Sequence, residues 1–185
     1  MNEAAKNIEA WSQQVQEQQP AAWNALPEIY LYMDQVITYM EKQLELLGRD
    51  KETAPLTSSM INNYVKDGVL PRPDKKKYSR EHLAMLTVIC MLKPVLSIPD
   101  ISQLLHADPQ NAFSQELYES FRHAGEEEMN AVCERAKHAA AQGDVQLMQL
   151  AATLSVEAAA RRTAAERILN ELARAEKQKK GGDSN

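Results

Sequence analysis

Apolar residues recur every three or four positions along most of the chain, which is the spacing of one face of an α-helix. The pattern is weak over 3–18 and strong over 31–47, 57–67, 80–92 and 98–105. The segment 31–47 is followed directly by Gly48, and glycine suits the end of a helix. The pattern therefore predicts a front half of short helices.

The helix predicted over 57–67 has one apolar and one polar side. Thr57 or Ser58 is expected to cap it and Gly68 to end it. Its expected buried side chains are Met60, Ile61, Tyr64 and Val65, and its polar face carries Ser59, Asn62, Asn63 and Lys66. Prolines at 71 and 73 forbid helix in the next segment, so residues 69–78 are predicted to form a short two-armed turn.

The second half of the chain favours long helices. All eight prolines lie between positions 20 and 109, so nothing interrupts the backbone ladder afterwards. A break is expected at Gly125, because His123 suits a helix C-terminus and the glutamates that follow suit an N-terminus. After a turn at Gly143, a helix over 145–177 carries a seam that is typical of a coiled coil, formed by Leu147, Ala151, Leu154, Ala158, Ala165, Ile168 and Leu172.

The composition of the chain limits the fold classes and the cellular compartments that can be expected. Aromatic residues make up 5% of the chain and there are 6 glycines, a poor supply for a β-sandwich or barrel. No window is apolar enough to cross a bilayer and the first residues lack a secretory signal, so we expect a cytoplasmic protein without membrane contact. Cys90 and Cys133 stand far apart in helical context and are expected to be reduced structural thiols.

The sequence shows no pattern typical of catalysis. It contains no glycine-rich phosphate loop, nucleophile elbow or His-Glu-x-x-His motif. The histidines, at positions 82, 106, 123 and 138, are scattered over separate predicted elements. We therefore expect no enzyme activity, no cofactor and no metal site.

Positive charge is concentrated in one stretch of an acidic protein. The whole chain carries a formal net charge of -5, whereas residues 57–93 contain seven Lys or Arg against three Asp or Glu. Six of the seven cations lie between positions 66 and 80. Charge runs are often solvated faces. Here, however, the neighbouring polar helix face offers short hydrogen-bonding side chains that can reach base edges or phosphates.

The same stretch resembles a known DNA-binding family. Residues 56–71, LTSSMINNYVKDGVLP, resemble the recognition helix and following turn of MerR-type winged helix proteins, including Tyr64 and the run from Gly68 to Pro71. The resemblance continues through Lys76, Tyr78, Ser79, Leu83, Leu86, Ile89, Ser97, Ile98 and Ile101. Approximately residues 25–130 are also similar to an uncharacterised bacterial domain-of-unknown-function family with YkrK-like members. These resemblances imply a winged helix-turn-helix and DNA binding.

Together the patterns predict an all-α protein: a MerR-like winged helix-turn-helix core with a C-terminal helical extension. The expected parts are an N-terminal helical arm (1–29), a DNA-binding domain (30–107), the extension (108–178) and a disordered tail (179–185). We expect a transcriptional regulator with its recognition helix at 57–67 and its basic wing at 72–77. The predicted DNA-binding residues are Ser58, Ser59, Asn62, Asn63, Lys66, Arg72, Lys75, Lys76, Lys77, Tyr78 and Arg80.

The expected partners are double-stranded DNA and a second copy of the chain, because paired half-sites compensate for the few bases that one recognition helix reads. The last two helices could instead fold back as a hairpin on their own core. Two other functions stay open: a protein interaction adaptor that uses a winged-helix surface, and a small-molecule sensor. In the sensor, Met129, Met148, Leu150 and Leu154 would line a pocket for an effector of unknown identity.

Overall fold

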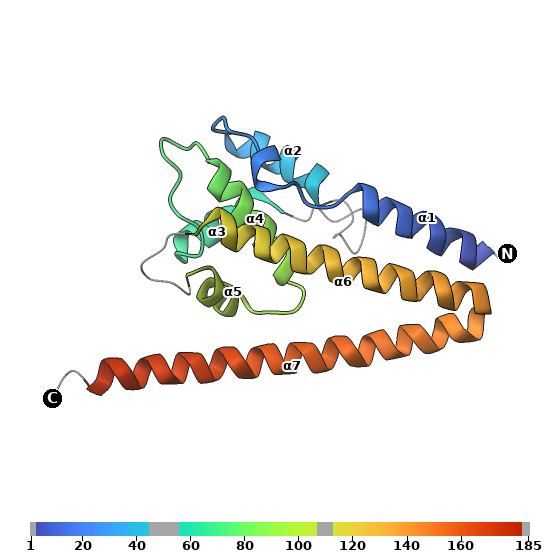
Figure 1. The fold of residues 1–185 in the computed structure, drawn as a ribbon. Helices are drawn as coiled ribbons and strands as arrows, with labels where there is room; N and C mark the ends of the chain where they lie inside the picture. Colours follow the sequence, from blue (N-terminus) through green and yellow to red (C-terminus); the bar gives the residue numbers. More distant parts are fainter. Residues whose placement is uncertain (1–2, 45–55, 107–112, 183–185) are drawn as a thin grey trace.

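The computed structural model describes residues 3–44, 56–106 and 113–182, and within these ranges the chain is helical and contains no strand (Figure 1). The elements are α1 (Glu3–Glu17), the 3-10 turn η1 (Trp23–Ala25), α2 (Met33–Gln43), α3 (Ser58–Lys66), α4 (Arg80–Leu92), α5 (Ile98–Leu105), α6 (Gln115–Gln142) and α7 (Asp144–Gly182). The all-α prediction is confirmed. In the described part of the chain, no helix combines the length and the apolar character needed to cross a membrane.

Helix α4 forms the centre of the core. Every side chain from His82 to Cys90 is buried, because this segment is apolar on all sides rather than along one stripe. Helices α2, α5 and α6 pack directly against it. Cys90 and Cys133 are both buried free thiols, as expected for structural cysteines, and burial raises the pKa of Cys90 to about 11.

The predicted starts of α3 and α5 agree with the structure. The Thr57 hydroxyl caps α3 by accepting from the Met60 N–H at 3.3 Å, and Ser97 caps α5 in the same way. The predicted end of the second helix at Gly48 lies outside the described residues. One side-chain prediction was wrong, because Met60 is exposed on α3 rather than buried.

Helix α1 packs along α6, so the N-terminal arm belongs to the same body as the core (Figure 1). The connection after α1 is held by Tyr118, a fully buried residue that sequence analysis did not single out. Its hydroxyl donates to the Ala21 carbonyl at 2.6 Å, and its ring lies 5.9 Å from the ring of Trp23. The Trp23 N–H donates to Glu119 Oε1 at 2.7 Å.

Tyr118→Phe is expected to lower the free energy of unfolding by about 1–2 kcal/mol, because the Ala21 carbonyl loses its donor while the ring packing remains. Urea unfolding followed by circular dichroism measures this change. Tyr30→Phe serves as the control, since Tyr30 is exposed. Equal unfolding midpoints for the Tyr118 variant and the unaltered protein would contradict the role given to this hydroxyl.

The predicted helix break at Gly125 was wrong, because α6 continues through this glycine without interruption. Arg122 spans it by donating to Glu119 at 2.7 Å and to Glu126 at 3.0 Å. A Cβ atom at Gly125 would lie 2.7 Å from the Met91 methyl of α4. The glycine therefore allows close approach of two helices instead of ending one.

Helices α6 and α7 form a hairpin that turns at Gly143, whose φ of 117° is in the left-handed region that favours glycine. Leu169, about two thirds of the way along α7, is buried in the core. This is the fold-back arrangement that the sequence left open. The predicted seam is only partly covered, since Ile168 and Leu172 are exposed. Helix α7 also reaches Gly182, so the first four residues of the predicted disordered tail are helical.

Candidate nucleic-acid interface

The outer face of α3 is polar and exposed. Ile61 and Tyr64 anchor the helix in the core, and their three-residue spacing turns the remaining positions outward. The exposed side chains are those predicted to bind DNA from this helix: Ser58, Ser59, Asn62, Asn63 and Lys66. The helix therefore presents hydroxyl and amide groups, with one cation near its end.

The chain leaves α3 through a tightly bonded turn. Gly68 adopts a φ of 73°, which allows the N–H groups of Val69 and Leu70 to donate to the Tyr64 carbonyl at 2.9 and 3.0 Å. Val69 and Leu70 are both buried. The segment that follows is therefore held at its base by apolar contacts.

Residues 71–78 form a two-armed turn, which we call the basic turn. At its base, Leu31 and Tyr78 exchange both backbone hydrogen bonds, at 3.0 and 2.8 Å. At its tip, the Lys77 N–H donates to the Asp74 carbonyl at 2.8 Å. Only these two isolated β-bridges are present, so the predicted wing exists as a turn without strands among the described residues.

Two lysines occupy an unusual backbone conformation at the tip. Lys75 has a φ of 47° and Lys76 a φ of 66°. A hairpin turn with two positive φ angles strongly prefers Asn-Gly or a similar pair at these positions. Strained residues of this kind often mark functional positions. Both lysine side chains are exposed, whereas Lys77 is half-buried with its Nζ 5.5 Å from the centre of the Tyr32 ring.

Two of the predicted DNA-binding residues are covered by the rest of the protein and stabilise the fold. Tyr78 is 3% exposed, so its side chain belongs to the core. Arg80 is also largely covered and forms an ion pair with Glu28 at 2.9 Å. We therefore remove Tyr78 and Arg80 from the candidate interface and assign them to holding the basic turn.

His82 connects the basic turn to α4, a role that sequence analysis did not predict. Its Nδ1 accepts from the Ser79 N–H at 3.0 Å, and its Nε2 lies 3.2 Å from the Pro71 carbonyl. This arrangement suits a neutral ring with its proton on Nε2. The signal was present in the sequence, because His82 stands three residues after Ser79, where a capping box has Glu or Gln. Burial lowers the pKa of His82 below its usual range.

A folded-state pKa below the unfolded value means that His82 contributes stability when it is neutral. That stability is present above about pH 6.5 and is lost as the pH falls toward the folded-state pKa. We expect His82→Gln, which keeps an acceptor for the Ser79 N–H, to lose less stability between about pH 7.5 and pH 5.5 than the unaltered protein. Urea unfolding at both pH values tests this, and parallel pH dependence would exclude it.

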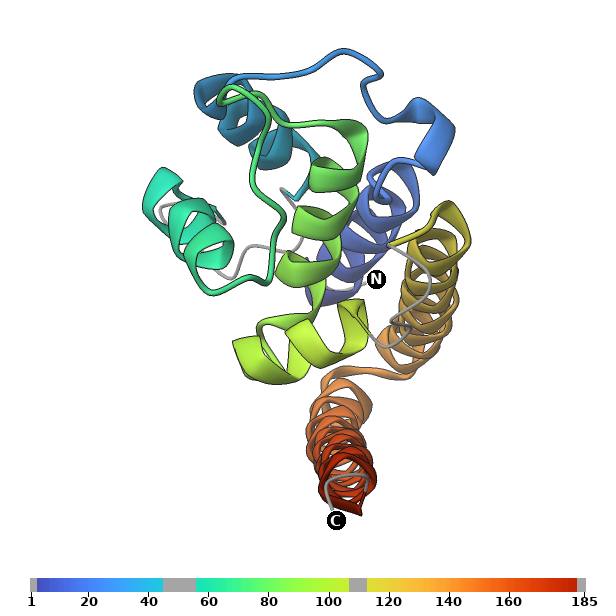
Figure 2. The same cartoon turned by 90° about the vertical axis from the view of Figure 1, so that its left-hand side faces the viewer.

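Helix α3 and the basic turn lie on the same side of the molecule, the side that faces the viewer in Figure 2. In the described residues, no ion pair involves Lys66, Arg72, Lys75 or Lys76. Helices α6 and α7 differ, since every arginine of these two helices pairs with a glutamate. The interface therefore gathers four cations that no carboxylate pairs with in the described part of the chain.

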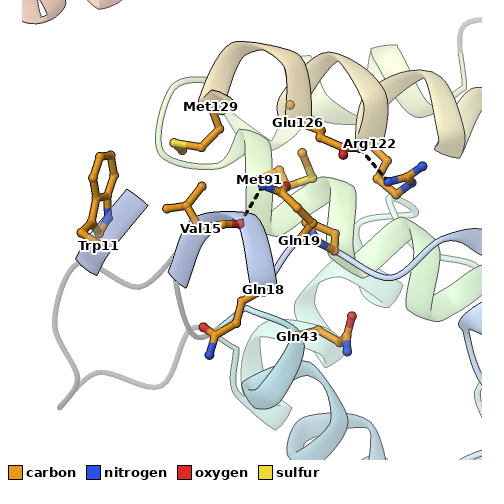
Figure 3. Close-up of a pocket in the computed structure, with 11 residues that line it drawn as sticks. Trp11, Val15, Gln18, Gln19, Gln43, Met91, Arg122, Glu126 and Met129 are labelled. Atoms are coloured by element: carbon orange, nitrogen blue, oxygen red, sulfur yellow. Dashed lines mark hydrogen bonds and ion pairs between the residues drawn. The ribbon is translucent and has the colours of Figure 1, made fainter. Parts of the chain in front are cut away.

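A separate pocket of about 220 Å³ lies where α1 meets α6 (Figure 3). Its apolar wall contains Trp11, Val15, Met91 and Met129. Several of its polar groups are engaged within the protein: Arg122 binds Glu126, and the Gln19 amide donates to the Val15 carbonyl at 2.8 Å. The pocket is therefore best explained as packing between the arm and the core.

The residues expected to line an effector pocket do not come together. Met129 lines the pocket beside α1, Leu154 lines a different cavity between α6 and α7, and Met148 is 73% exposed. In the described part of the chain, no three His, Cys, Asp or Glu side chains are grouped so that they could hold a metal ion.

Comparison with known proteins gives one match. A family model described as a domain of unknown function, DUF1836, matches residues 21–123, from the connection after α1 into α6. No curated protein and no solved structure matches the chain. The expected domain-of-unknown-function resemblance is thus confirmed, whereas its YkrK-like and MerR-type parts find no support in these comparisons.

Proposed function

The chain belongs to the DUF1836 family, and from this premise we propose that it binds double-stranded DNA through α3 and the basic turn. The proposed role is a transcriptional regulator with a core related to the MerR-type winged helix-turn-helix. In this proposal α3 is the recognition helix and the basic turn is a short wing.

The uncompensated cations beside α3 carry the proposal. Duplex DNA attracts lysine and arginine side chains because their contacts with phosphates release condensed counterions. Lys66, Arg72, Lys75 and Lys76 offer such contacts without first breaking an internal ion pair. The positive φ angles of Lys75 and Lys76 add support, since Asn and Gly fit that backbone better but carry no charge.

The two kinds of side chain would have different roles. Lysine and arginine contacts with phosphates position a protein on DNA, whereas contacts with base edges determine sequence preference. Asn62 and Asn63 are exposed on α3 and can pair with adenine in the major groove through two hydrogen bonds. Ser58 and Ser59 lie at the start of the same helix, where hydroxyls suit phosphate or base contacts.

Fluorescence anisotropy with a labelled mixed-sequence duplex tests the proposal directly. We expect saturable binding whose affinity falls steeply as salt rises, with a slope of about -3 to -5 in a plot of log affinity against log salt. Absence of binding at low salt would exclude the DNA function. Because the surface would still be exposed and polar, the protein interaction adaptor would then be the better interpretation.

Replacing Asn62 or Asn63 by alanine is expected to reduce the preference for the best sequence by about 1–3 kcal/mol per lost base contact. Nonspecific affinity should hardly change, because the phosphate contacts remain. The best sequence is first selected from a random duplex pool, and anisotropy then compares it with a scrambled duplex. Asn170→Ala, on the exposed surface of α7, is the matched control. An unchanged ratio of the two affinities would exclude both asparagines as base readers.

We also propose that the chain forms a homodimer through the outward face of α7. Val145, Met148 and Val156 are all at least 65% exposed, and they lie along one side of the helix at positions that suit helix pairing. Helix α7 is about 60 Å long at 1.5 Å per residue, so it offers a long contact line. A two-fold dimer would present two copies of α3 to two half-sites.

A further inference from the structure

A cavity of about 740 Å³ lies between the α6–α7 hairpin and the region where α4 leads into α5. Its volume falls in the usual range for small-molecule sites. The wall is mostly apolar and draws on α4, α5, α6 and α7, with Leu92, Leu96, Leu104, Val132, Leu154 and Ala158. The cavity therefore unites elements that are distant in sequence.

The cavity lies between two points at which α7 is held to the rest of the protein. At one end Gly143 joins the two helices, and they diverge from this turn with α5 in the opening (Figure 1). Toward the other end Leu169 is buried, and the Gln103 amide donates to its carbonyl at 3.3 Å. Between these points the small side chains of Ala131 and Ala158 leave space unfilled.

Two ion pairs connect α6 and α7 beside the cavity. Arg135 binds Glu157 through two hydrogen bonds of 2.8 and 2.9 Å. Arg161 binds Glu128 at 2.5 Å. Both pairs are substantially exposed, so each contributes little to stability and can rearrange at low cost.

One arginine of the lining has terminal nitrogens that can receive a carboxylate. The lining contains three arginines and two glutamates, and Arg135 and Arg161 are paired with those two glutamates. The additional arginine is Arg162, whose Nε donates to Glu166, a residue outside the lining. Within the described residues, neither terminal nitrogen of Arg162 forms a hydrogen bond or an ion pair. A guanidinium with free terminal nitrogens can hold a carboxylate through parallel hydrogen bonds.

We propose that this cavity binds an amphipathic monocarboxylate. The hydrocarbon part of the ligand lies against the apolar wall, and its carboxylate binds Arg162, with Arg161 beside it. Burial of the hydrocarbon provides most of the affinity, and the arginines select an acidic head group. The site is independent of α3 and the basic turn.

Isothermal titration with dodecanoate, kept below its micellar concentration and without DNA, tests the proposal. We expect one site per chain and an affinity at least about tenfold higher than for dodecanol or dodecyltrimethylammonium, because only dodecanoate satisfies the arginines. Arg162→Gln should reduce the affinity for dodecanoate about tenfold and leave dodecanol unchanged.

The location is tested by filling the cavity. Ala158→Phe places a ring in the proposed site and should weaken dodecanoate binding at least tenfold, while cavity filling leaves the thermal unfolding midpoint equal or higher. Ala164→Phe adds the same ring on an exposed part of α7 and should bind as the unaltered protein does. If Ala158→Phe fails to fold, Val132→Phe on α6 repeats the test. The proposal is overturned if dodecanoate does not saturate, if the three head groups bind equally, or if a folded cavity-filled variant keeps full affinity.

Discussion

Replacing Lys75, Lys76 and Lys77 together by alanine is expected to weaken binding to every duplex by about 100-fold or more at low salt. The loss should be similar for all sequences, because phosphate contacts carry no sequence information. The slope of log affinity against log salt should become shallower by up to about three units, close to one for each lost phosphate contact. Anisotropy titrations at several salt concentrations measure both quantities.

Two further variants separate charge from folding. Lys75→Asn with Lys76→Gly places the preferred residues at the two positive φ positions, so it should keep or raise the stability of the turn while weakening DNA binding. Alanine at Lys6, Lys137 and Arg167 removes the same charge from other surfaces and should leave the slope unchanged. An unchanged affinity and slope in the variant of the basic turn would exclude the DNA function.

The combined change Met148→Glu and Val156→Glu is expected to convert a dimer into a monomer. Both side chains are exposed on one side of α7, so glutamates there should not disturb the fold but would face their own copies across a two-fold contact. Sedimentation equilibrium at micromolar concentration should then give the 20.8 kDa chain mass instead of twice that value. Affinity for a duplex with two half-sites should fall about 100-fold or more, since the second half-site no longer binds at high effective concentration.

A matched variant controls for added charge. Thr153→Glu with Ala164→Glu introduces the same charges on exposed positions of α7 outside the proposed contact, and it should remain dimeric. A purely monomeric mass for the unaltered protein would contradict the homodimer. In that case the exposed face of α7 would not bring two copies of the recognition helix together.

Much of the local structure could be predicted from the sequence. The starts of α3, α4 and α5 follow from Thr57, Ser79 and Ser97, because caps and apolar spacing act within one or two helical turns. The exposed face of α3 was predicted for the same reason, since burial of Ile61 and Tyr64 orients its neighbours. The exposure of Met60 was not, because it lies at the edge of the apolar stripe.

The candidate interface was predicted only in part. Local charge density identified the basic turn correctly, and the two prolines excluded helix there. Whether each cation is free to contact DNA, however, depends on carboxylates and aromatic rings from distant parts of the chain. Arg80 is engaged by Glu28, and the burial of Tyr78 depends on its pairing with Leu31. Both partners lie about fifty residues earlier in the chain, a separation that no local pattern reports.

What the sequence by itself determined is therefore the helical class, the starts of α3, α4 and α5 and the concentration of positive charge at 66–80, since all three depend on neighbours along the chain. Tertiary structure decided where a helix continues or folds back. Gly125 looked like a helix end, yet it permits the close approach of Met91 from α4. No sequence motif marks Tyr118, whose role depends on its hydrogen bond to the distant Ala21 carbonyl. The α6–α7 cavity likewise depends on the contact between α7 and Gln103 of α5. These features depend on side chains that come into contact only when distant segments pack together. A short stretch of sequence therefore does not reveal the contacts that stabilise them.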